Sequence, residues 1–282
     1  MPVDARRFIR KMRGGAQAHL IEASDGHFYV VKFVNNPQHR RVLINEWIAA
    51  TFLRYLGLSS PEVAMVRISE DFVAANPEVN LQLGRQSMAP AVGWHFGSRH
   101  PGDPARTTVY DFLPDALLVR VANLAEFAGV LAFDKWMSNA DARQAIFFRA
   151  KITGSGAPGR GAAGLGFVAQ MVDNGYVFEG PHWRLTDSPL QGLYFRPLVY
   201  AHLRGLTDFE PWLERIRHFP EEVVDQAIKQ IPPAWLDAEG LDGERDEFER
   251  LLYRLMERRK RVPDLIEGCR TGRVDPFPGW RK

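Results

Sequence analysis

The sequence is poor in cysteine. Cys269 is the single cysteine among 282 residues. One cysteine can form no intramolecular disulfide, and it cannot supply the several thiolates of a structural zinc site. Both are therefore excluded, and a reducing compartment fits the composition.

Long apolar runs are also missing. No window approaches the roughly 18 to 20 apolar residues that a membrane-spanning helix requires. Several arginines stand near the start, but no apolar stretch follows them, as it would in a signal peptide. We therefore expect a protein without a membrane segment, located in the cytoplasm.

Neither sign of charge dominates, because 36 Lys and Arg stand against 34 Asp and Glu. This balance gives no argument for nucleic-acid binding. The eight histidines show no metal-ligand spacing, and no Gly-x-Ser-x-Gly motif is present. Zinc hydrolase and serine hydrolase functions therefore have no support. With 45% hydrophobic and 25% charged residues, the chain has the composition of an ordinary globular protein.

Residues 1–90 show mainly strand patterns and one helix. Two β-favouring runs, 17–23 and 27–34, flank a Ser-Asp-Gly turn and predict a hairpin. Between residues 40 and 56, apolar residues recur at spacings of three and four, which predicts an amphipathic helix ended by Gly57. Further strands are expected at 61–68 and 80–83.

Glycine and proline are concentrated between Ser87 and Asp111, so we expect little regular structure there. Later patterns predict helices at 116–122 and 124–136, short strands at 145–152 and 165–172, and helices at 198–203, 209–217, 221–231 and 244–261. The expected units are an N-terminal lobe of 1–90, a connector of 91–111, a C-terminal lobe of 112–262 and a tail of 263–282. This order predicts an α+β, bilobal, protein-kinase-like fold with a mainly helical second lobe.

Lys32 lies at the end of the second hairpin strand, where alternation points it away from Val31. Val-Val-Lys-Phe resembles the Val-Ala-Ile-Lys strand of kinases, whose lysine contacts the nucleotide phosphates. Glu46, in the middle of the predicted helix, is the natural partner for that ammonium group. Taken alone, the two residues could equally be a sheet-edge lysine and a solvated glutamate.

Two glycine-rich segments have different interpretations. Gly14 and Gly15 precede the first hairpin strand and could let the backbone approach nucleotide phosphates closely. The segment 154–159 matches Gly-x-Gly-x-x-Gly, but no helix opens after it, as a dinucleotide site requires. We interpret it as the tip of the hairpin formed by the two later strands.

The sequence Asp173-Asn174-Gly175 closes the second of those strands. It resembles Asp-Phe-Gly of kinases, whose aspartate binds the magnesium ion that bridges the phosphates. These residue types also form ordinary turns. Its position after a possible catalytic loop, with Lys32 and Glu46 upstream, favours the metal-binding interpretation.

The loop that follows the 124–136 helix can be interpreted in two registers. In the first, Asp134 is the catalytic base and Asn139 a metal ligand, as in the Asp-x-x-x-x-Asn spacing of ordinary kinases. In the second, Asn139-Ala140-Asp141 resembles the Gly-Asn-x-Asp loop of HipA-like kinases, in which the later aspartate takes the hydroxyl proton. We favour the second, because Asp134 still lies in the helical pattern, where a buried acid that pairs with Arg143 or caps the loop is expected.

The order of these motifs resembles the HipA-like kinase family in its short, single-domain form. The matching elements are Val31-Lys32, Glu46, Phe96-Gly97-Ser98-Arg99, Asn139-x-Asp141, Val172-Asp173-x-Gly175 and the helical part that begins near Ile231-Pro232. The resemblance implies an ATP-dependent serine/threonine kinase that uses Mg²⁺. Because some members are toxins of toxin–antitoxin pairs, it also implies an antitoxin-like partner.

The sequence departs from the family at two places. Arg143 stands where the family usually has histidine, and Ile146 stands where an asparagine is expected. Gln144 could replace that asparagine as a metal ligand. A nucleotide-binding pseudokinase, a small-molecule kinase of the aminoglycoside or choline type, and a helical interaction module built on 197–262 therefore stay open. The phosphoryl acceptor is not identified by the sequence.

Overall fold

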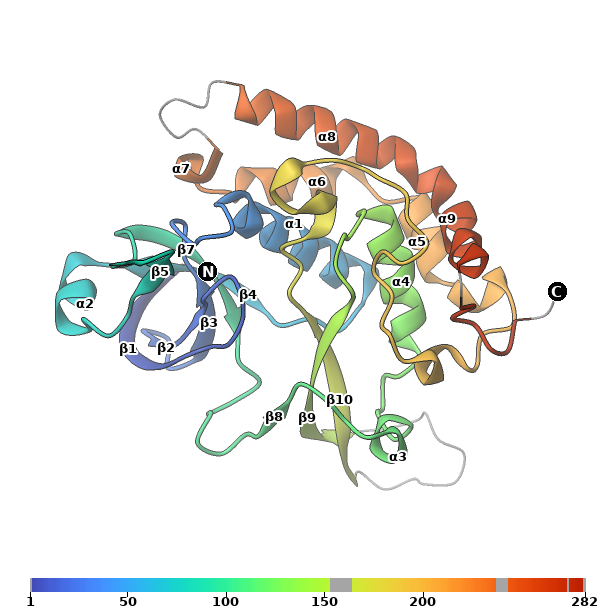
Figure 1. Ribbon diagram of the computed structural model, residues 1–282, viewed down its shortest axis with the longest axis horizontal. Helices are drawn as coiled ribbons and strands as arrows, with labels where there is room; N and C mark the ends of the chain where they lie inside the picture. The colour runs from blue at the N-terminus through green and yellow to red at the C-terminus, as the bar shows by residue number, and fades with distance from the viewer. Residues whose placement is uncertain (1, 153–163, 237–242, 273, 281–282) are drawn as a thin grey trace.

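The computed structural model describes residues 2–152, 164–236, 243–272 and 274–280. The early strands form a barrel on one side, and most helices lie on the other (Figure 1). The glycine-rich segment 154–159, interpreted above as a hairpin tip, lies outside the described residues. None of the described helices combines the length and apolar character that crossing a membrane requires.

Five strands form the closed barrel, in the order β1-β2-β3-β7-β4. Their bounds are β1 Val3–Lys11, β2 His19–Ala23, β3 Phe28–Lys32, β7 Gly93–Arg99 and β4 Val63–Ile68. Neighbours are antiparallel except β1 and β4, whose parallel pairing closes the barrel. Alternate side chains fill its interior, among them Ile21, Val31 and Val66, each fully buried. The barrel is therefore a packed core of its own.

The predicted hairpin is confirmed as β2 and β3, but β1, α2 and β6 were not expected. Strand β1 precedes the hairpin, although its run of exposed arginines gives little apolar alternation. A second helix, α2 (Glu70–Ala75), is capped by the Ser69 side chain, which accepts a hydrogen bond from the Phe72 amide. The prediction of one helix in residues 1–90 is therefore wrong. A small hairpin of β5 (Leu81–Leu83) and β6 (Gln86–Met88) completes this part.

The prediction that 91–111 is an irregular connector is wrong for β7. This strand lies in the barrel between β3 and β4 and pairs with both. Its glycines were interpreted as breakers, but Gly97 serves close packing. A Cβ on Gly97 would lie 2.6 Å from the Val66 Cγ2 and 3.3 Å from the Tyr29 Cβ. Strand β8 (Val109–Tyr110) lies in the same predicted connector.

Helix α1 (Arg41–Leu56) confirms the predicted amphipathic helix and lies between the barrel and the remaining helices (Figure 1). Its apolar residues, including Ile44, Ile48 and Phe52, belong to the larger of two hydrophobic cores. Gly57 ends it in the left-handed conformation, with a φ of 71°. The helix therefore connects the barrel with the second core.

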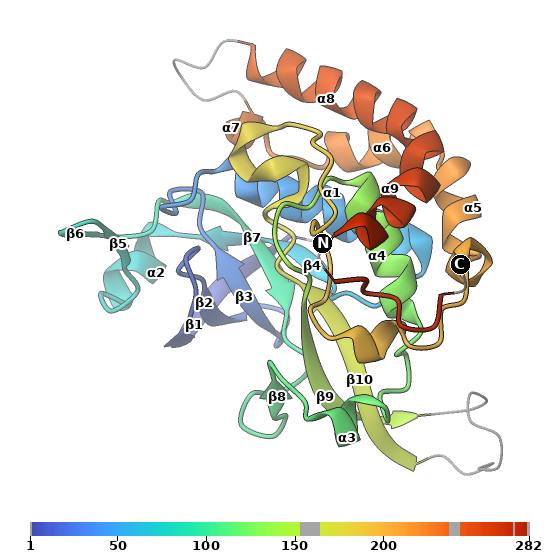
Figure 2. The ribbon, with the colours of Figure 1, turned by 45° about the vertical axis from the view of Figure 1, so that its right-hand side comes forward.

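The second part of the chain is built around α4 (Glu126–Trp136), which is buried along nearly its whole length. Strands β9 (Gln144–Ile152) and β10 (Gly164–Val172) form the predicted hairpin, joined at its edge by β8. The other helices of this part lie around α4, the hairpin and α1, with α8 outermost (Figure 2). Their bounds are α3 Asp115–Leu118, α5 Trp212–Arg217, α6 Glu221–Lys229, α7 Pro233–Leu236, α8 Glu244–Arg258 and α9 Val262–Gly268. The helix predicted at 198–203 is only a 3₁₀ turn at Pro197–Tyr200.

Candidate functional site

Lys32 is at the end of β3 and turns outward from the barrel, as the alternation predicts. Its ammonium group contacts the Glu46 carboxylate of α1 and donates a hydrogen bond of 2.7 Å to Asp173 Oδ1. Only 11% of the Lys32 side chain and 4% of the Glu46 side chain are exposed. The structure thus brings together three predicted residues that are separated by up to 141 positions in the sequence.

The charge state of Lys32 follows from these neighbours. Burial alone would lower its pKa, because a charged amine loses hydration in the protein interior. The negative charges of Glu46 and Asp173 outweigh burial and raise the pKa above its ordinary value. Lys32 is therefore positively charged, and it lies at the end of the barrel where β3 ends.

Asp173 follows the last residue of β10 with a φ of 59°, a conformation that turns its side chain out of the strand. The side chain is 41% exposed. The charge of Lys32 lowers the pKa of Asp173, against the opposing effect of burial, and a hydrogen bond from the Gln144 side chain adds to the lowering. Gln144 pairs with Val172 across the β9–β10 hairpin. Asp173 is therefore an ionised, accessible carboxylate with a carboxamide beside it.

Asp141 lies in the loop between α4 and β9 and is half-buried. Its amide donates to the Asn139 Oδ1 at 3.2 Å, and its carbonyl accepts from the Gly192 amide at 3.1 Å. Burial, and then the charge of Asp173, raise the pKa of Asp141, while Arg143 and Lys32 act in the opposite direction. Asp141 thus belongs to the same electrostatic cluster, with more affinity for a proton than an ordinary aspartate.

Asp134 has a different environment, because its side chain is fully buried in α4. Arg143 binds both of its oxygens, one of them through Nε at 2.8 Å. The Asn139 Nδ2 donates to Asp134 Oδ1 at 2.9 Å. The expected pairing of Asp134 with Arg143 is confirmed, and neither oxygen is left open to a substrate.

Asn139 was proposed above as a metal ligand, and its geometry does not support that role. It is 1% exposed. Its amide nitrogen is bound to Asp134, and its oxygen accepts from the backbone of Asp141. Because both ends of the carboxamide hold the loop, we assign Asn139 to loop support.

Sequence analysis missed a buried polar network behind these acids. Arg143 also donates to the Asn174 Oδ1 at 2.8 Å and to the Val172 carbonyl at 3.1 Å. Asn174 in turn donates to Glu46 Oε2 at 3.4 Å. The sequence feature that could have indicated this network is Asn174, a polar residue where the kinase motif has phenylalanine.

Helix α1 is fixed by two further residues that were not predicted. Asn45 donates to the carbonyls of Gly175, Val177 and Gly180 at 2.8, 3.1 and 3.0 Å. Arg41 pairs with Glu244 and Glu247 of α8. Asn45 could have been identified from the sequence, because it is an asparagine inside an apolar helical pattern. These contacts hold Glu46 where it meets Lys32.

Gly14 and Gly15 lie in the turn that joins β1 and β2. The register Lys11–His19–Val31 puts this turn at the Lys32 end of the barrel. Gly14 has a φ of 119°, and a Cβ on Gly15 would lie 2.8 Å from the Gln38 Nε2. The positive φ suits glycine at position 14, whereas the flexible Gln38 side chain could move away from a larger residue at position 15.

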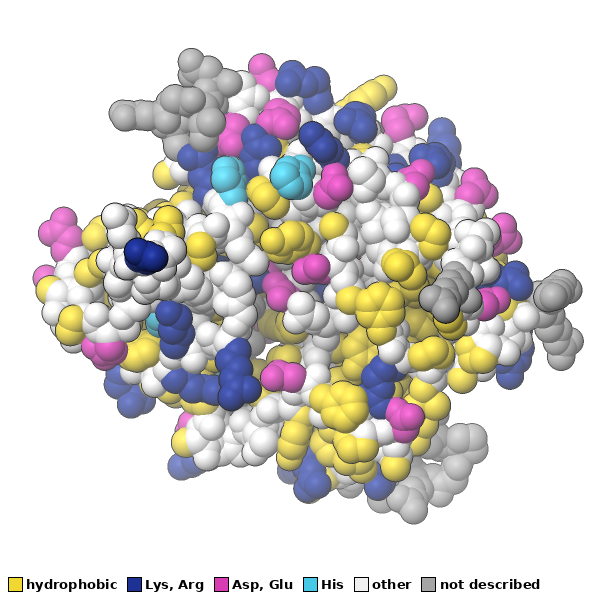
Figure 3. Space-filling model, viewed as in Figure 1, with side chains coloured by type: hydrophobic (Ala, Val, Ile, Leu, Met, Phe, Trp, Pro, Cys, Tyr) yellow, Lys and Arg dark blue, Asp and Glu magenta, His cyan; other side chains and the backbone are white. Residues whose placement is uncertain are grey.

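A cavity of about 810 Å³ opens between the barrel and the β9–β10 hairpin. Phe28 and His100 line it from the barrel side, and Phe148 and Gln170 line it from the hairpin. Phe28 precedes Lys32 by four residues on the same face of β3, about 13 Å along the strand. Figure 3 shows this face of the molecule hollowed beside the barrel, with acidic side chains at the edge. Strands β3 and β10 thus both run from the cavity, at Phe28 and Gln170, to the charged cluster at Lys32 and Asp173.

Comparisons with known proteins found one matching family and similar solved structures. The sequence model of the HipA-like kinase family matches residues 6–146, half of the chain. Among solved structures, a Golgi casein kinase is similar with a TM-score of 0.54 and 12% identity over 96% of this chain and 75% of that one. The same kinase with Mn and ADP bound has a TM-score of 0.50 and 11% identity, over 96% and 73%. No curated protein sequence matches significantly. At these identities the structural likeness shows the fold alone, which is mixed α and β and kinase-like.

Proposed function

Because the chain belongs to the HipA-like kinase family, we propose that it transfers the γ-phosphoryl group of ATP to a serine or threonine hydroxyl. The observation that carries this proposal is the position of Lys32 between Glu46 and Asp173. Kinases require the lysine–glutamate pair and the metal-binding aspartate together. Here one ammonium group contacts both acids.

The nucleotide would lie along the cavity, with its phosphates at Lys32. The Gly14–Gly15 turn covers that end, and its backbone can approach phosphate oxygens closely. At the other end, the Gln170 Oε1 is buried without a hydrogen-bond partner among the described residues, and Gln170 lines the cavity. A rotation of this side chain toward the cavity would present the oxygen as an acceptor to the amino group of adenine. The similar kinase that has Mn and ADP bound supports the use of a nucleotide and a divalent metal.

A divalent metal fits the donors at the end of β10. Mg²⁺ prefers oxygen ligands and usually takes only one or two from the protein. The accessible Asp173 carboxylate supplies one oxygen, and the adjacent Gln144 carboxamide supplies a second. When bound, the ion would neutralise charge on the phosphates.

Asp141 is the proposed base. It would accept the proton of the acceptor hydroxyl while that oxygen forms a bond to the γ-phosphorus and the bond to the β–γ bridging oxygen breaks, releasing ADP. Its raised pKa favours proton uptake. Asp134, with both oxygens held by Arg143, would support the loop instead.

We also propose that the two parts act as lobes. Since β7 belongs to the barrel, the N-terminal lobe extends to Arg99 rather than to residue 90. The connector then begins at His100, whose imidazole lines the cavity. Residues 112–262 form the catalytic lobe, and the tail packs on it through Phe277.

The test is a phosphoryl-transfer assay on purified protein with ATP and Mg²⁺. We expect ADP release, with phosphoserine or phosphothreonine identified by mass spectrometry on the protein itself or on an added protein substrate. Phosphorylation of aminoglycosides or choline alone would replace the proposal by a small-molecule kinase. Thermal stabilisation by ATP and Mg²⁺ without any transfer would identify a pseudokinase, which the Ile146 position makes the main rival.

A further inference from the structure

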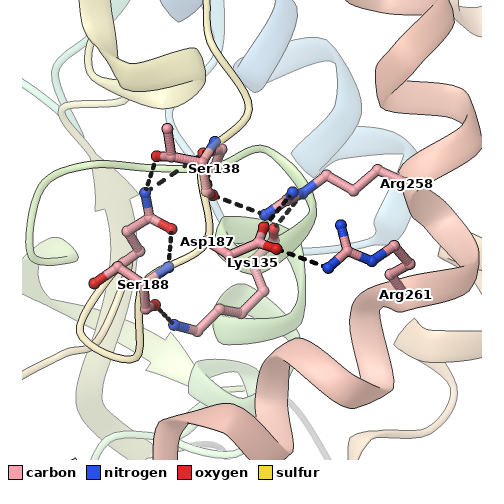
Figure 4. Close-up of polar contacts among 8 residues, drawn as sticks. Lys135, Ser138, Asp187, Ser188, Arg258 and Arg261 are labelled. Atoms are coloured by element: carbon pink, nitrogen blue, oxygen red, sulfur yellow. Dashed lines mark hydrogen bonds and ion pairs between the residues drawn. The ribbon is translucent and has the colours of Figure 1, made fainter.

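The segment after Asp173 contains a loop, residues 186–191, that buried side chains hold in place; we call it the anchor loop. Lys135 of α4 is 1% exposed and donates to the carbonyls of Ser188 and Pro189 at 2.8 and 3.1 Å. The Ser138 hydroxyl donates to the Thr186 carbonyl at 2.9 Å and accepts from the Thr186 amide at the same distance. Figure 4 shows these groups converging on the loop.

Asp187 joins the anchor loop to the end of α8 and the turn that follows it. Its two oxygens pair with Arg258 at 2.6 Å and with Arg261 at 2.7 Å (Figure 4). Arg258 is 5% exposed and also donates to the carbonyls of Thr186 and Lys135. The Arg258 guanidinium therefore ties α4, the anchor loop and α8 together around one carboxylate.

The anchor loop leads directly to the proposed base. Gly192 follows it with a φ of 67°, and a Cβ there would lie 2.8 Å from the Asp134 Cγ. The Gly192 amide donates to the Asp141 carbonyl, and the Arg143 amide donates to the Leu193 carbonyl, both at 3.1 Å. A shift of the anchor loop would therefore move the Asp141 carbonyl and the backbone of Arg143, two residues further on.

We propose that Asp187 is a positioning residue: by pairing with Arg258 and Arg261 it fixes the anchor loop and, through Gly192, the backbone of Asp141. In many protein kinases a phosphate added to the activation loop supplies the anion that pairs with arginines and orders the loop. Here the chain carries a carboxylate in that role permanently. Ordering of the anchor loop therefore requires no phosphorylation.

This inference rests on the proposed function for its kinetic test. We would measure kcat and KM for ATP in Asp187→Asn, in Asp187→Glu, and in the control Asp264→Asn, an exposed acid of the neighbouring helix α9. We expect kcat to fall about tenfold or more in Asp187→Asn, because small displacements of catalytic groups are costly. The KM for ATP should change less than about twofold, since Lys32 and Asp173 are untouched. Asp187→Glu should restore most of kcat, and the control should match wild type.

A second variant tests the same ion pairs in case Asp187→Asn does not fold. Arg261→Gln removes only the more exposed partner, whose side chain is 56% exposed, so we expect a drop in kcat of about threefold and an unchanged fold. Wild-type kcat should also be unchanged after phosphatase treatment. Unchanged kcat in Asp187→Asn, parallel losses in kcat and ATP affinity, or loss of activity after phosphatase treatment would each overturn the proposal.

Hydrogen exchange separates this proposal from the proposed function. Amides of residues 139–143 and 186–193 should exchange faster in Asp187→Asn than in wild type, while those of α1 keep their protection. If the wild-type protein transferred no phosphate, the proposed function would fail, and this exchange pattern would still decide the positioning role. Equal exchange in both proteins would refute it.

Discussion

Two nearby aspartates, one in the last turns of α4 and one in the loop that follows, have opposite environments. Asp134 is fully buried, and both of its oxygens are bound by Arg143. Seven residues later, Asp141 is half-buried, with a raised pKa and the second acid Asp173 nearby. The same side-chain type is thus held in a buried ion pair at one position and is open to the proposed chemistry at the other. The difference is produced by partners, since only Asp134 has a cation dedicated to it.

The comparison also explains how Arg143 can replace the usual histidine. Its guanidinium has enough donors to hold Asp134, Asn174 and the Val172 carbonyl at once. The loop and the Asp-Asn-Gly segment are therefore fixed to each other through one buried side chain. Arg143 thus connects the segment that carries the proposed base with the segment that carries the proposed metal ligand.

The largest effect on phosphoryl transfer is expected at Asp173, the accessible acid near Asp141. Asp173→Ala removes the proposed metal-binding carboxylate and should reduce phosphoryl transfer below detection. The fold should persist, because Lys32 keeps Glu46 as a partner. Radiolabelled ATP and circular dichroism would measure both, with Asp264→Ala as the control. Appreciable turnover by a folded Asp173→Ala protein would place the metal elsewhere.

At the buried aspartate, the substitution Asp134→Asn should lower the free energy of unfolding. It leaves the Arg143 charge buried without its partner, and breaking such a pair typically lowers the free energy of unfolding by about 3–5 kcal/mol. Denaturant unfolding of wild type and variant gives the difference. Replacing Asp4, whose pair with Arg67 is largely exposed, should cost no more than about 1 kcal/mol. Equal losses of unfolding free energy at Asp134 and Asp4 would contradict the conclusion that the buried pair stabilises the fold.

A smaller effect concerns the titration of Asp141. In metal-free protein its carboxyl should titrate above the ordinary aspartate range, and that of Asp173 below it. The negative charge of Asp173 disfavours a second negative charge, so Asp173→Asn should lower the pKa of Asp141. Carboxyl ¹³C chemical shifts followed against pH would measure both groups. An Asp141 that titrates below the ordinary range would contradict the electrostatic account.

Local patterns predicted the elements that carry the site, but not how they meet. Helix α1, the β9–β10 hairpin and the outward face of Lys32 follow from periodicity within single segments. Strand β7 was missed because the glycines that admit its neighbours Tyr29 and Val66 look like breakers until those neighbours are known. Asn139 illustrates a related limit, since a carboxamide suits a metal or a loop equally. Its hydrogen bonds with Asp134 and Asp141, which no local pattern could predict, favour loop support.

The central claim is that Asp141 is the base and Asp134 the support. The most direct test compares kcat per folded molecule in Asp141→Asn and Asp134→Asn. We predict that Asp141→Asn keeps wild-type stability and loses about 10²–10⁴ in kcat. Asp134→Asn should be less stable yet more active per folded molecule than Asp141→Asn. A nearly silent Asp141→Asn beside a folded but inactive Asp134→Asn would contradict the account.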